Sequence, residues 1–333
     1  MARKVPRRTT ARSQPWGIVF GLLIFQCFSF TPSLAQDSGF YPGKLGIAKA
    51  KTLSLEERGV EARFAAYLEA QTDGAITRYK TKYGKEINTD NVRELSTDYA
   101  PGGMDAIDEA TNAARTRWGE AVFQPARALA RELYSRALKQ NTPPQQRQQV
   151  VFTAGGAGVG KTTSIRQLPG LAHAVDAAEI TVDTTLSDLH TASERIDQAL
   201  HAGRMVSIVL IYRDPVDALV KGVFPRAKAI GRIPTLAGFL ETHLGSAETL
   251  PKVAKKYKDN SRVAIAVIDN SRGVEFASLS DVGFIEKMAR KYGREELKVK
   301  LLQAAEVFYE KGKKGDPTGI SENLYRVFKE HGR

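Results

Sequence analysis

The chain has 333 residues, of which 42% are hydrophobic and 26% charged, and its formal net charge is +12 at pH 7. This hydrophobic content is ample for a buried core and excludes an intrinsically disordered chain. The positive charge suits an anionic, phosphorylated substrate and equally an ordinary solvated surface. It comes with no zinc-finger spacing and no basic stripe interleaved with aromatic residues, which argues against nucleic acid as a partner.

The range 1–35 is predicted to be a signal peptide or membrane anchor. Five basic residues and no acidic residue precede the apolar run 16–30, after which Ser33 and Ala35 have the spacing of a cleavage site. The run is shorter than the ~20 residues of a membrane span, so a cleaved signal peptide is favoured. The only cysteine, Cys27, lies here, so the mature chain would form no intramolecular disulfide. We therefore expect an exported or anchored protein whose membrane contact, if uncleaved, is confined to this segment.

A linker follows, over 36–52, where glycine, proline and polar residues are mixed. Helical periodicity then begins near Leu53, where Ser54 and Glu57 have the spacing of a capping box, and continues to about residue 84.

The region that leads to residue 145 is predicted to be helical throughout. We expect a loop with a short helix over 87–103 and a long helix over 104–139, kinked or restarted at Pro125. A polar connector, 140–149, completes it. The range 53–145 is therefore expected to be an all-helical lead-in.

The stretch 150–163, VVFTAGGAGVGKTT, carries the clearest functional motif. An apolar run of strand character enters a glycine-rich loop that ends in Gly-Lys-Thr, the G-x-x-x-x-G-K-[ST] pattern of a phosphate-binding P-loop. Backbone N–H groups of such a loop face phosphate oxygens, Lys161 reaches the β- and γ-phosphates, and the Thr162 hydroxyl ligates Mg²⁺. The predicted nucleotide-binding residues of this loop are Gly155, Gly156, Ala157, Gly158, Val159, Gly160, Lys161, Thr162 and Thr163.

Strands and helices alternate after the P-loop, as in α/β proteins. This pattern predicts a P-loop NTPase fold in which helices cover a parallel sheet, with its core over 146–280 and charged C-terminal helices over 281–333. The apolar runs of strand length are 179–183, 205–212 and 263–269.

Each of these three runs ends at or just before a carboxylate: Asp183, Asp214 or Asp269. A P-loop enzyme uses such a residue to hold Mg²⁺ or to activate an attacking hydroxyl, and parallel strands direct their carboxyl ends to the phosphate site. Asp183 is the preferred candidate because it follows the P-loop helix most closely. The alternative is that it caps the next helix, and for Asp214, which precedes Pro215, capping is the preferred interpretation.

Arg226 and Arg232 lie between the two long buried strands, in FPRAKAIGRIPT. Arginines on such a segment can close over phosphates and offset charge in the transition state, although each alone would more often be a surface residue. His243 follows on a helical segment, where a structural role is expected.

The motifs GGAGVGKTT, VDTTLSD, ERIDQALHAGRMVSIVLIYRDP, GRIPT and VAIAVIDNSRG, in this order, resemble those of zeta toxin-like P-loop kinases over about residues 85–275. The N-K-x-D motif of GTPases and the acidic strand of AAA-type ATPases are missing, which also favours a small-molecule kinase. In one respect the chain departs from the family: little sequence separates the P-loop helix from VDTTL, so that a separate acidic strand of the toxins is missing or merged.

The resemblance implies ATP-dependent phosphorylation of a small molecule; for the best-known toxins this is the 3′-hydroxyl of UDP-N-acetylglucosamine. It implies ATP and Mg²⁺ as cofactors, and an antitoxin or other protein as a partner. Carried onto this chain, Lys161 and Thr162 hold phosphate and Mg²⁺, and Asp183 is the base or the metal-side carboxylate. The remaining implied site residues are the lid arginines Arg226 and Arg232, and Asn270 near the nucleotide base.

Two other hypotheses are kept. The protein could be a nucleotide-dependent binding or assembly ATPase that engages a partner through its helical lead-in, or an exported domain whose P-loop has lost function. Export also conflicts with the need for ATP. The conflict disappears if the domain is delivered into another cell, if an anchor leaves it facing the cytosol, or if translation starts downstream and the protein is cytoplasmic.

Overall fold

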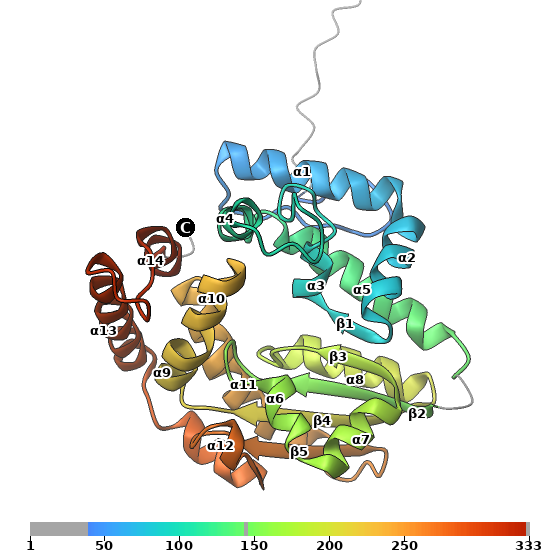
Figure 1. The fold of residues 1–333 in the computed structure, drawn as a ribbon. Coiled ribbons are helices and arrows are strands. Elements are labelled where there is room, and N and C mark those ends of the chain that lie inside the picture. The colour runs from blue at the N-terminus through green and yellow to red at the C-terminus, as the bar shows by residue number, and fades with distance from the viewer. Residues whose placement is uncertain (1–38, 143–145, 331–333) are drawn as a thin grey trace, which may run out of the picture. The chain divides into compact units, whose positions relative to one another are not determined.

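The computed structural model describes residues 39–142 and 146–330, so the predicted targeting segment lies outside the described residues. These described residues form one compact unit. At its centre is a six-stranded sheet in the order β1-β3-β2-β4-β5-β6 (Figure 1). The first five strands are parallel and β6 is antiparallel to β5. The strands are β1 (Glu86–Asn88), β2 (Arg147–Ala154), β3 (Ala178–Asp183), β4 (Met205–Tyr212), β5 (Val263–Asp269) and β6 (Ser278–Ser280).

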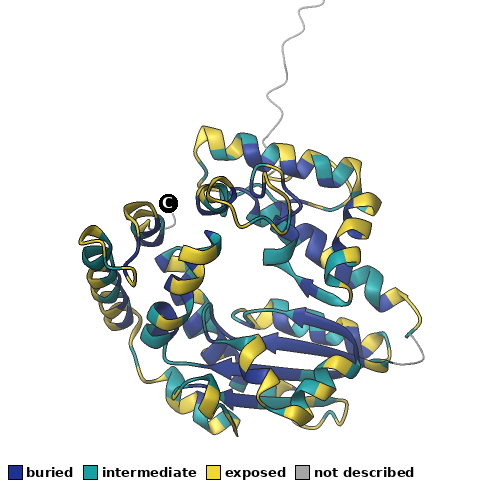
Figure 2. Cartoon of the chain, in the orientation of Figure 1, coloured by how far each residue is buried: buried dark blue, intermediate teal, exposed yellow. Residues whose placement is uncertain are grey.

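Helices cover both faces of this sheet, and its central strands are buried (Figures 1 and 2). Alternate residues of a strand point to opposite faces. Phe152 and Leu210 accordingly join one core cluster, whereas Val151 and Val209 join a second cluster on the other face of the sheet. The α/β prediction with a parallel sheet is confirmed. The helices of the second half are α6 (Lys161–Arg166), α7 (Pro169–Ala177), α8 (Leu189–His201), α9 (Pro215–Ala218), α10 (Phe224–Ile230), α11 (Leu236–Lys256), α12 (Val282–Ala289), α13 (Arg294–Lys313) and α14 (Glu322–Lys329).

The lead-in contains the expected helices, and its first helix begins with the predicted capping box of Ser54 and Glu57. The long helix predicted over 104–139 is two helices, separated by a turn at 119–122. Pro125 lies in the first turn of the second, where its missing N–H costs nothing. The helices are α1 (Leu55–Ala70), α2 (Thr72–Tyr83), α3 (Thr89–Arg93), α4 (Glu109–Trp118) and α5 (Phe123–Lys139).

One element of the lead-in corrects the expectation that this region is all helical. Strand β1 pairs in parallel with β3, with Ile87 opposite Val182 and Asn88 opposite Asp183. Three residues are too few to show strand alternation, so the sequence carries no local signal. The segment becomes a strand because the edge of β3 is available for pairing.

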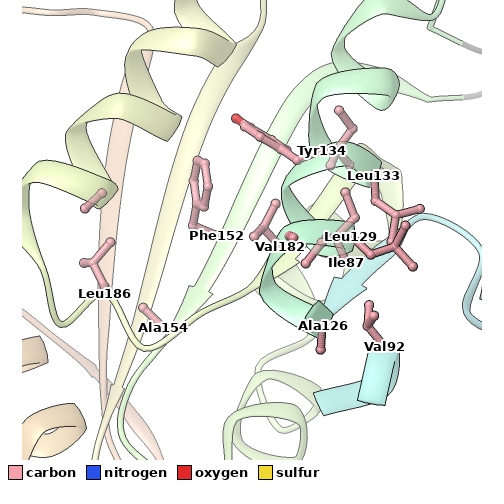
Figure 3. Close-up of a cluster of buried hydrophobic side chains, with 14 of the residues drawn as sticks. Ile87, Val92, Ala126, Leu129, Leu133, Tyr134, Phe152, Ala154, Val182 and Leu186 are labelled. Carbon is pink, nitrogen blue, oxygen red and sulfur yellow. The ribbon is translucent and has the colours of Figure 1, made fainter. Parts of the chain in front are cut away.

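Helix α5 holds β1 against the sheet. Its apolar face, which includes Leu129 and Tyr134, packs over Ile87, Val182 and Phe152 (Figure 3). The rings of Tyr134 and Phe152 meet edge to face, with centroids 6.1 Å apart. The lead-in is therefore continuous with the core of the sheet, and α3 begins directly beside the end of β3.

The helices around the second face pack through aromatic side chains. Phe224 of α10 contacts Phe308 of α13 and Phe328 of α14, with ring centroids 5.2 and 5.9 Å apart. These contacts order the C-terminal region that was predicted to be helical. Within the described residues, no helix combines the length and apolar character that a membrane crossing would require.

Candidate phosphate-binding site

The P-loop lies where the chain changes direction across the sheet. It follows β2, which has β3 on one side and β4 on the other. Ligands of open α/β sheets bind outside the carboxyl ends of strands at such a switch point. The same edge carries the ends of β1 and β3, so that residues from upstream and downstream of the P-loop meet there (Figure 1).

The conformation of the loop requires glycine, most clearly at Gly155 and Gly158. Gly155 has φ 134°, and a Cβ there would lie 2.4 Å from the carbonyl oxygen of Ile211 at the end of β4. Gly158 has φ 77°, and its Cβ would lie 2.4 Å from the carbonyl oxygen of Ala218. Both contacts are far shorter than van der Waals distance. The loop therefore packs directly against the end of β4 and the end of α9.

His243 of α11 forms a hydrogen bond with the loop backbone. Its Nε2 lies 2.9 Å from the carbonyl oxygen of Ala157, and its ring packs against Phe239 at a centroid distance of 4.2 Å. Burial lowers the pKa of His243 to about 4, although the bond to Ala157 opposes this shift. The neutral ring therefore donates its Nε2 proton to the loop, and the expected structural role of His243 is confirmed.

Asn270, which follows β5 and is predicted to lie near the nucleotide base, packs against the P-loop. Its side chain is fully buried and donates from Nδ2 to the carbonyl oxygen of Val159 at 2.6 Å. Its backbone N–H donates to the carbonyl oxygen of Tyr212. In this structure Asn270 therefore contacts the loop backbone, and its predicted place near the nucleotide base stays a prediction. The apolar strand before it gave no sign of this, because loop and strand are brought together only by the fold.

Asp183 stands beside the P-loop lysine. Lys161 Nζ lies 3.2 Å from one carboxylate oxygen of Asp183 and donates to the carbonyl oxygen of Gly155. Asn88 Nδ2 donates to the other oxygen at 2.8 Å. Thr153 Oγ1 donates, at 3.3 Å, to the oxygen that Lys161 contacts. The helix after β3 is capped by Asp188 instead, so the capping alternative for Asp183 is wrong.

The other two strand-end carboxylates have structural partners. Asp214 caps α9, as predicted, and accepts hydrogen bonds from Lys291 and Tyr292. Asp269 accepts from the backbone N–H of Ser271. Neither contact involves the P-loop.

Thr162 and Asp183 provide oxygen ligands of the kind that Mg²⁺ prefers. Thr162 is exposed at the start of α6, and Asp183 contacts the adjacent lysine. The part of the chain that the structure describes contains no group of three histidine, cysteine, aspartate or glutamate side chains able to hold a metal ion. A P-loop site needs no such group, because phosphate oxygens complete the coordination.

Sequence reasoning missed Asp90, in the first turn of α3. Its carboxylate lies 3.6 Å from Arg93. Partial burial would raise the pKa of Asp90, but the positive charges of Arg93, Arg232, Arg226 and Lys161 outweigh it and hold the pKa at about 2. Both predicted lid arginines and the P-loop lysine thus act on one carboxylate. The polar stretch INTDN predicts a loop, and no motif in the sequence indicates that Asp90 belongs to the site.

The two arginines are placed differently. Arg226 is exposed on α10, whereas Arg232 forms an ion pair with the buried Glu94 at 2.6 Å. Glu86 of β1 also faces this region: burial and the charge of Asp183 raise the pKa of its carboxyl group.

The chain has remote similarity to solved structures. A chain of the crystal structure of AvrRxo1-ORF1:AvrRxo1-ORF2 with sulphate ions is 12% identical, with a TM-score of 0.37 over 68% of this chain and 92% of that one. A chain of the PezAT chromosomal toxin–antitoxin system of Streptococcus pneumoniae is 12% identical, with a TM-score of 0.28 over 61% and 96%. The signal recognition particle receptor FtsY of Elizabethkingia anophelis, in complex with GDP, is 14% identical, with a TM-score of 0.18 over 73% and 98%.

No protein-family model matches the chain, and no curated protein matches it. Similarities of this strength assign no family.

Proposed function

We propose that the protein is an ATP-dependent small-molecule kinase of the zeta toxin type, which transfers the γ-phosphoryl group to a hydroxyl of a small acceptor. The observation that carries the proposal is the position of Lys161. It lies at the end of a glycine-rich loop at the switch point of a parallel sheet, 3.2 Å from a strand-end carboxylate. That combination supports phosphate binding and places an anionic group beside it.

In this proposal the residues of the site have three roles: binding the triphosphate, neutralising its charge and holding the loop in place. The backbone of 155–160 and Lys161 bind the triphosphate, and Arg226 and Arg232 offset the charge that develops in the transition state. Thr162 and Asp183 would hold Mg²⁺, which neutralises phosphate charge when bound. The asparagine and histidine beneath the loop keep its N–H groups oriented, so little reorganisation is needed when the nucleotide arrives.

The acceptor belongs to the proposal as a class. We infer a small hydroxyl compound, for which a nucleotide sugar such as UDP-N-acetylglucosamine is the first candidate, and an antitoxin as the first protein partner to seek. Both come from the motif resemblance. The basic character of the chain suits an acceptor that carries phosphate.

Removal of the P-loop lysine tests the function directly. The protein, incubated with ATP, Mg²⁺ and a panel of nucleotide sugars, should yield a phosphorylated acceptor detectable by mass spectrometry. Lys161→Ala should lower transfer by at least ~10³-fold, because the γ-phosphate loses its charge partner, while the unfolding temperature stays within a few degrees of wild type. Lys252→Ala, on the surface of α11, is the matched control and should leave transfer unchanged.

Three outcomes would decide against the kinase. Tight ATP binding without transfer to any acceptor would overturn it. Slow ATP hydrolysis stimulated by a protein partner would instead support the binding or assembly ATPase. Failure to bind ATP would support a P-loop that has lost function.

A further inference from the structure

Two aspartates stand at the phosphate edge of the sheet, and their surroundings differ. Both oxygens of the Asp183 carboxylate are engaged: one accepts from Asn88, and the other accepts from Thr153 and contacts Lys161. A carboxylate held in this way has little freedom to take a new proton donor, because its lone pairs already have partners.

The Asp90 carboxylate is open. Its backbone N–H donates to Asn88 Oδ1 at 2.8 Å, which fixes the first turn of α3. Its side chain has 41% of its surface exposed, and its single ion pair, to Arg93, is 3.6 Å long. Within the described residues no donor reaches this carboxylate at hydrogen-bond distance. Its accepting positions are therefore available to a ligand.

Two arginines around Asp90 also have N–H donors without a hydrogen-bond partner. The Nε atoms of Arg93 and Arg232 are buried and have no hydrogen-bond partner within 39–142 and 146–330. A buried donor without a partner is costly, and such groups mark places where a ligand or water completes the site. Arg226 and Lys161 add charge at the same place. The exposed carboxylate can accept a hydrogen bond from a neutral hydroxyl, and the unpartnered donors of the surrounding cations can bind an anionic phosphate beside it.

We propose that Asp90 is the catalytic residue that faces the acceptor hydroxyl, and that Asp183 serves the metal and Lys161. This inference rests on the proposed kinase function and assigns its two carboxylates. Asp90 lies on the lead-in, upstream of the P-loop, so the catalytic site is assembled from both halves of the chain.

The step balances without a further reactant. The acceptor oxygen forms a bond to the γ-phosphorus of ATP, and the bond from that phosphorus to the β–γ bridging oxygen breaks, so ADP leaves. The hydroxyl proton passes to Asp90 and then to solvent. Because the cations keep Asp90 ionised at neutral pH, it accepts the hydroxyl hydrogen bond before transfer and takes the proton late.

Glu86 is the competing carboxylate, and its position argues against it. It lies on β1, two residues before Asn88, and accepts from the side-chain amides of Asn88 and Asn91, each at 3.4 Å. Glu86 is thus held by two asparagines, of which Asn88 also contacts Asp183, and within the described residues it forms no ion pair with an arginine. We assign it no contact with the acceptor.

The experiment compares isosteric variants of the full chain. Asp90→Asn and Asp183→Asn are measured with Asp105→Asn, an exposed aspartate of the lead-in, as the matched control. Each is assayed for phosphoryl transfer, for slow ATP hydrolysis in which water replaces the acceptor, and for affinity toward a non-hydrolysable ATP analogue with and without Mg²⁺. Asp90→Ser replaces Asp90→Asn if the latter does not fold.

Asp90→Asn should lower transfer and hydrolysis by about 10²–10⁴-fold. Its nucleotide affinity should be unchanged or up to about tenfold tighter, because a negative charge has been removed from among four cations. A purely structural residue would weaken nucleotide binding. Asp183→Asn should instead reduce the gain in affinity that Mg²⁺ provides.

Hydrolysis separates the two proposals. If wild type hydrolyses ATP but phosphorylates no acceptor, the kinase proposal fails, and the effect of Asp90→Asn on hydrolysis still decides the role of Asp90. Transfer or hydrolysis within tenfold of wild type in Asp90→Asn overturns this inference. So does weakened nucleotide binding in that variant, or a wild type with neither activity.

Discussion

Single glycines control how the P-loop lies on its support. Gly222, in the π-helical turn Leu219–Val223, faces the loop, and a Cβ there would lie 2.2 Å from the carbonyl oxygen of Gly158. Gly222→Ala must therefore push the loop away. We expect a loss of about 1–3 kcal/mol in the free energy of unfolding and nucleotide binding weaker by about tenfold or more, measured by urea unfolding and calorimetry.

Gly170, in α7, is the matched control for that substitution. A Cβ at this position would meet nothing within 4 Å, so Gly170→Ala should leave nucleotide binding unchanged and stabilise the protein by up to about 1 kcal/mol through helix propensity. Equal effects of the two alanines on binding would show that the close approach of Gly222 to the loop is unimportant.

His243 makes stability depend on pH. The ordinary histidine pKa of 6.5 applies to the unfolded chain, whereas burial lowers the folded-state pKa to about 4. Between these pH values the unfolded chain binds more protons, so the free energy of unfolding falls as pH falls from 6.5 to 4 and then levels off. The span corresponds to roughly 3 kcal/mol. Denaturant titrations at pH 7, 5.5 and 4.5 measure it.

His243→Gln isolates this contribution. A glutamine amide can still donate to the carbonyl oxygen of Ala157, but it does not titrate. The variant should therefore be less stable than wild type at pH 7 because of lost packing on Phe239, and the difference should shrink toward pH 4.5. A constant difference across this range would contradict the assigned role of the histidine.

At the scale of elements, the sequence predicts well the strands whose side chains are buried on both faces of the sheet. Strands β4 and β5 have the predicted bounds, and β3 begins one residue early, because a continuous apolar run has few other stable outcomes in an α/β protein. Strand β1 and strand β6 have three residues each and depend on a neighbouring edge. Helix α7 begins at Pro169 and has no fully buried residue, and its apolar side chains Leu171 and Val175 pack against the core only in part.

The same distinction holds in the candidate site. The P-loop is found from sequence because its chemistry requires glycines, lysine and threonine at fixed spacing. Asp183 is found because it ends an apolar strand. Asp90 is not, since its surroundings are made by Arg226 and Arg232, which lie more than a hundred residues downstream. Contacts of that kind arise from tertiary structure and leave no local pattern.

At the scale of the whole molecule, the lead-in and the P-loop half are joined through a buried charge cluster. Glu94 follows α3 and pairs with Arg115 of α4 at 2.7 Å and with Arg232 of the P-loop half at 2.6 Å. Nearby, Thr116 donates to the carbonyl oxygen of Gly231. The segment after α10 is thus anchored to the lead-in near Asp90, so the contacts that join the two halves also hold Arg232 in the candidate site.

Removal of the shared carboxylate should therefore affect both stability and activity. The Glu94 side chain is fully buried, and Glu94→Gln leaves two arginines with no charge partner at this point. The free energy of unfolding should fall by about 3–5 kcal/mol, and Arg232 should lose its fixed position, which lowers phosphoryl transfer in the fraction that remains folded. Glu56→Gln removes an exposed pair with Arg117 and should cost under about 0.5 kcal/mol. A Glu94→Gln variant as stable as Glu56→Gln would mean that this charge cluster contributes little to holding the two halves together.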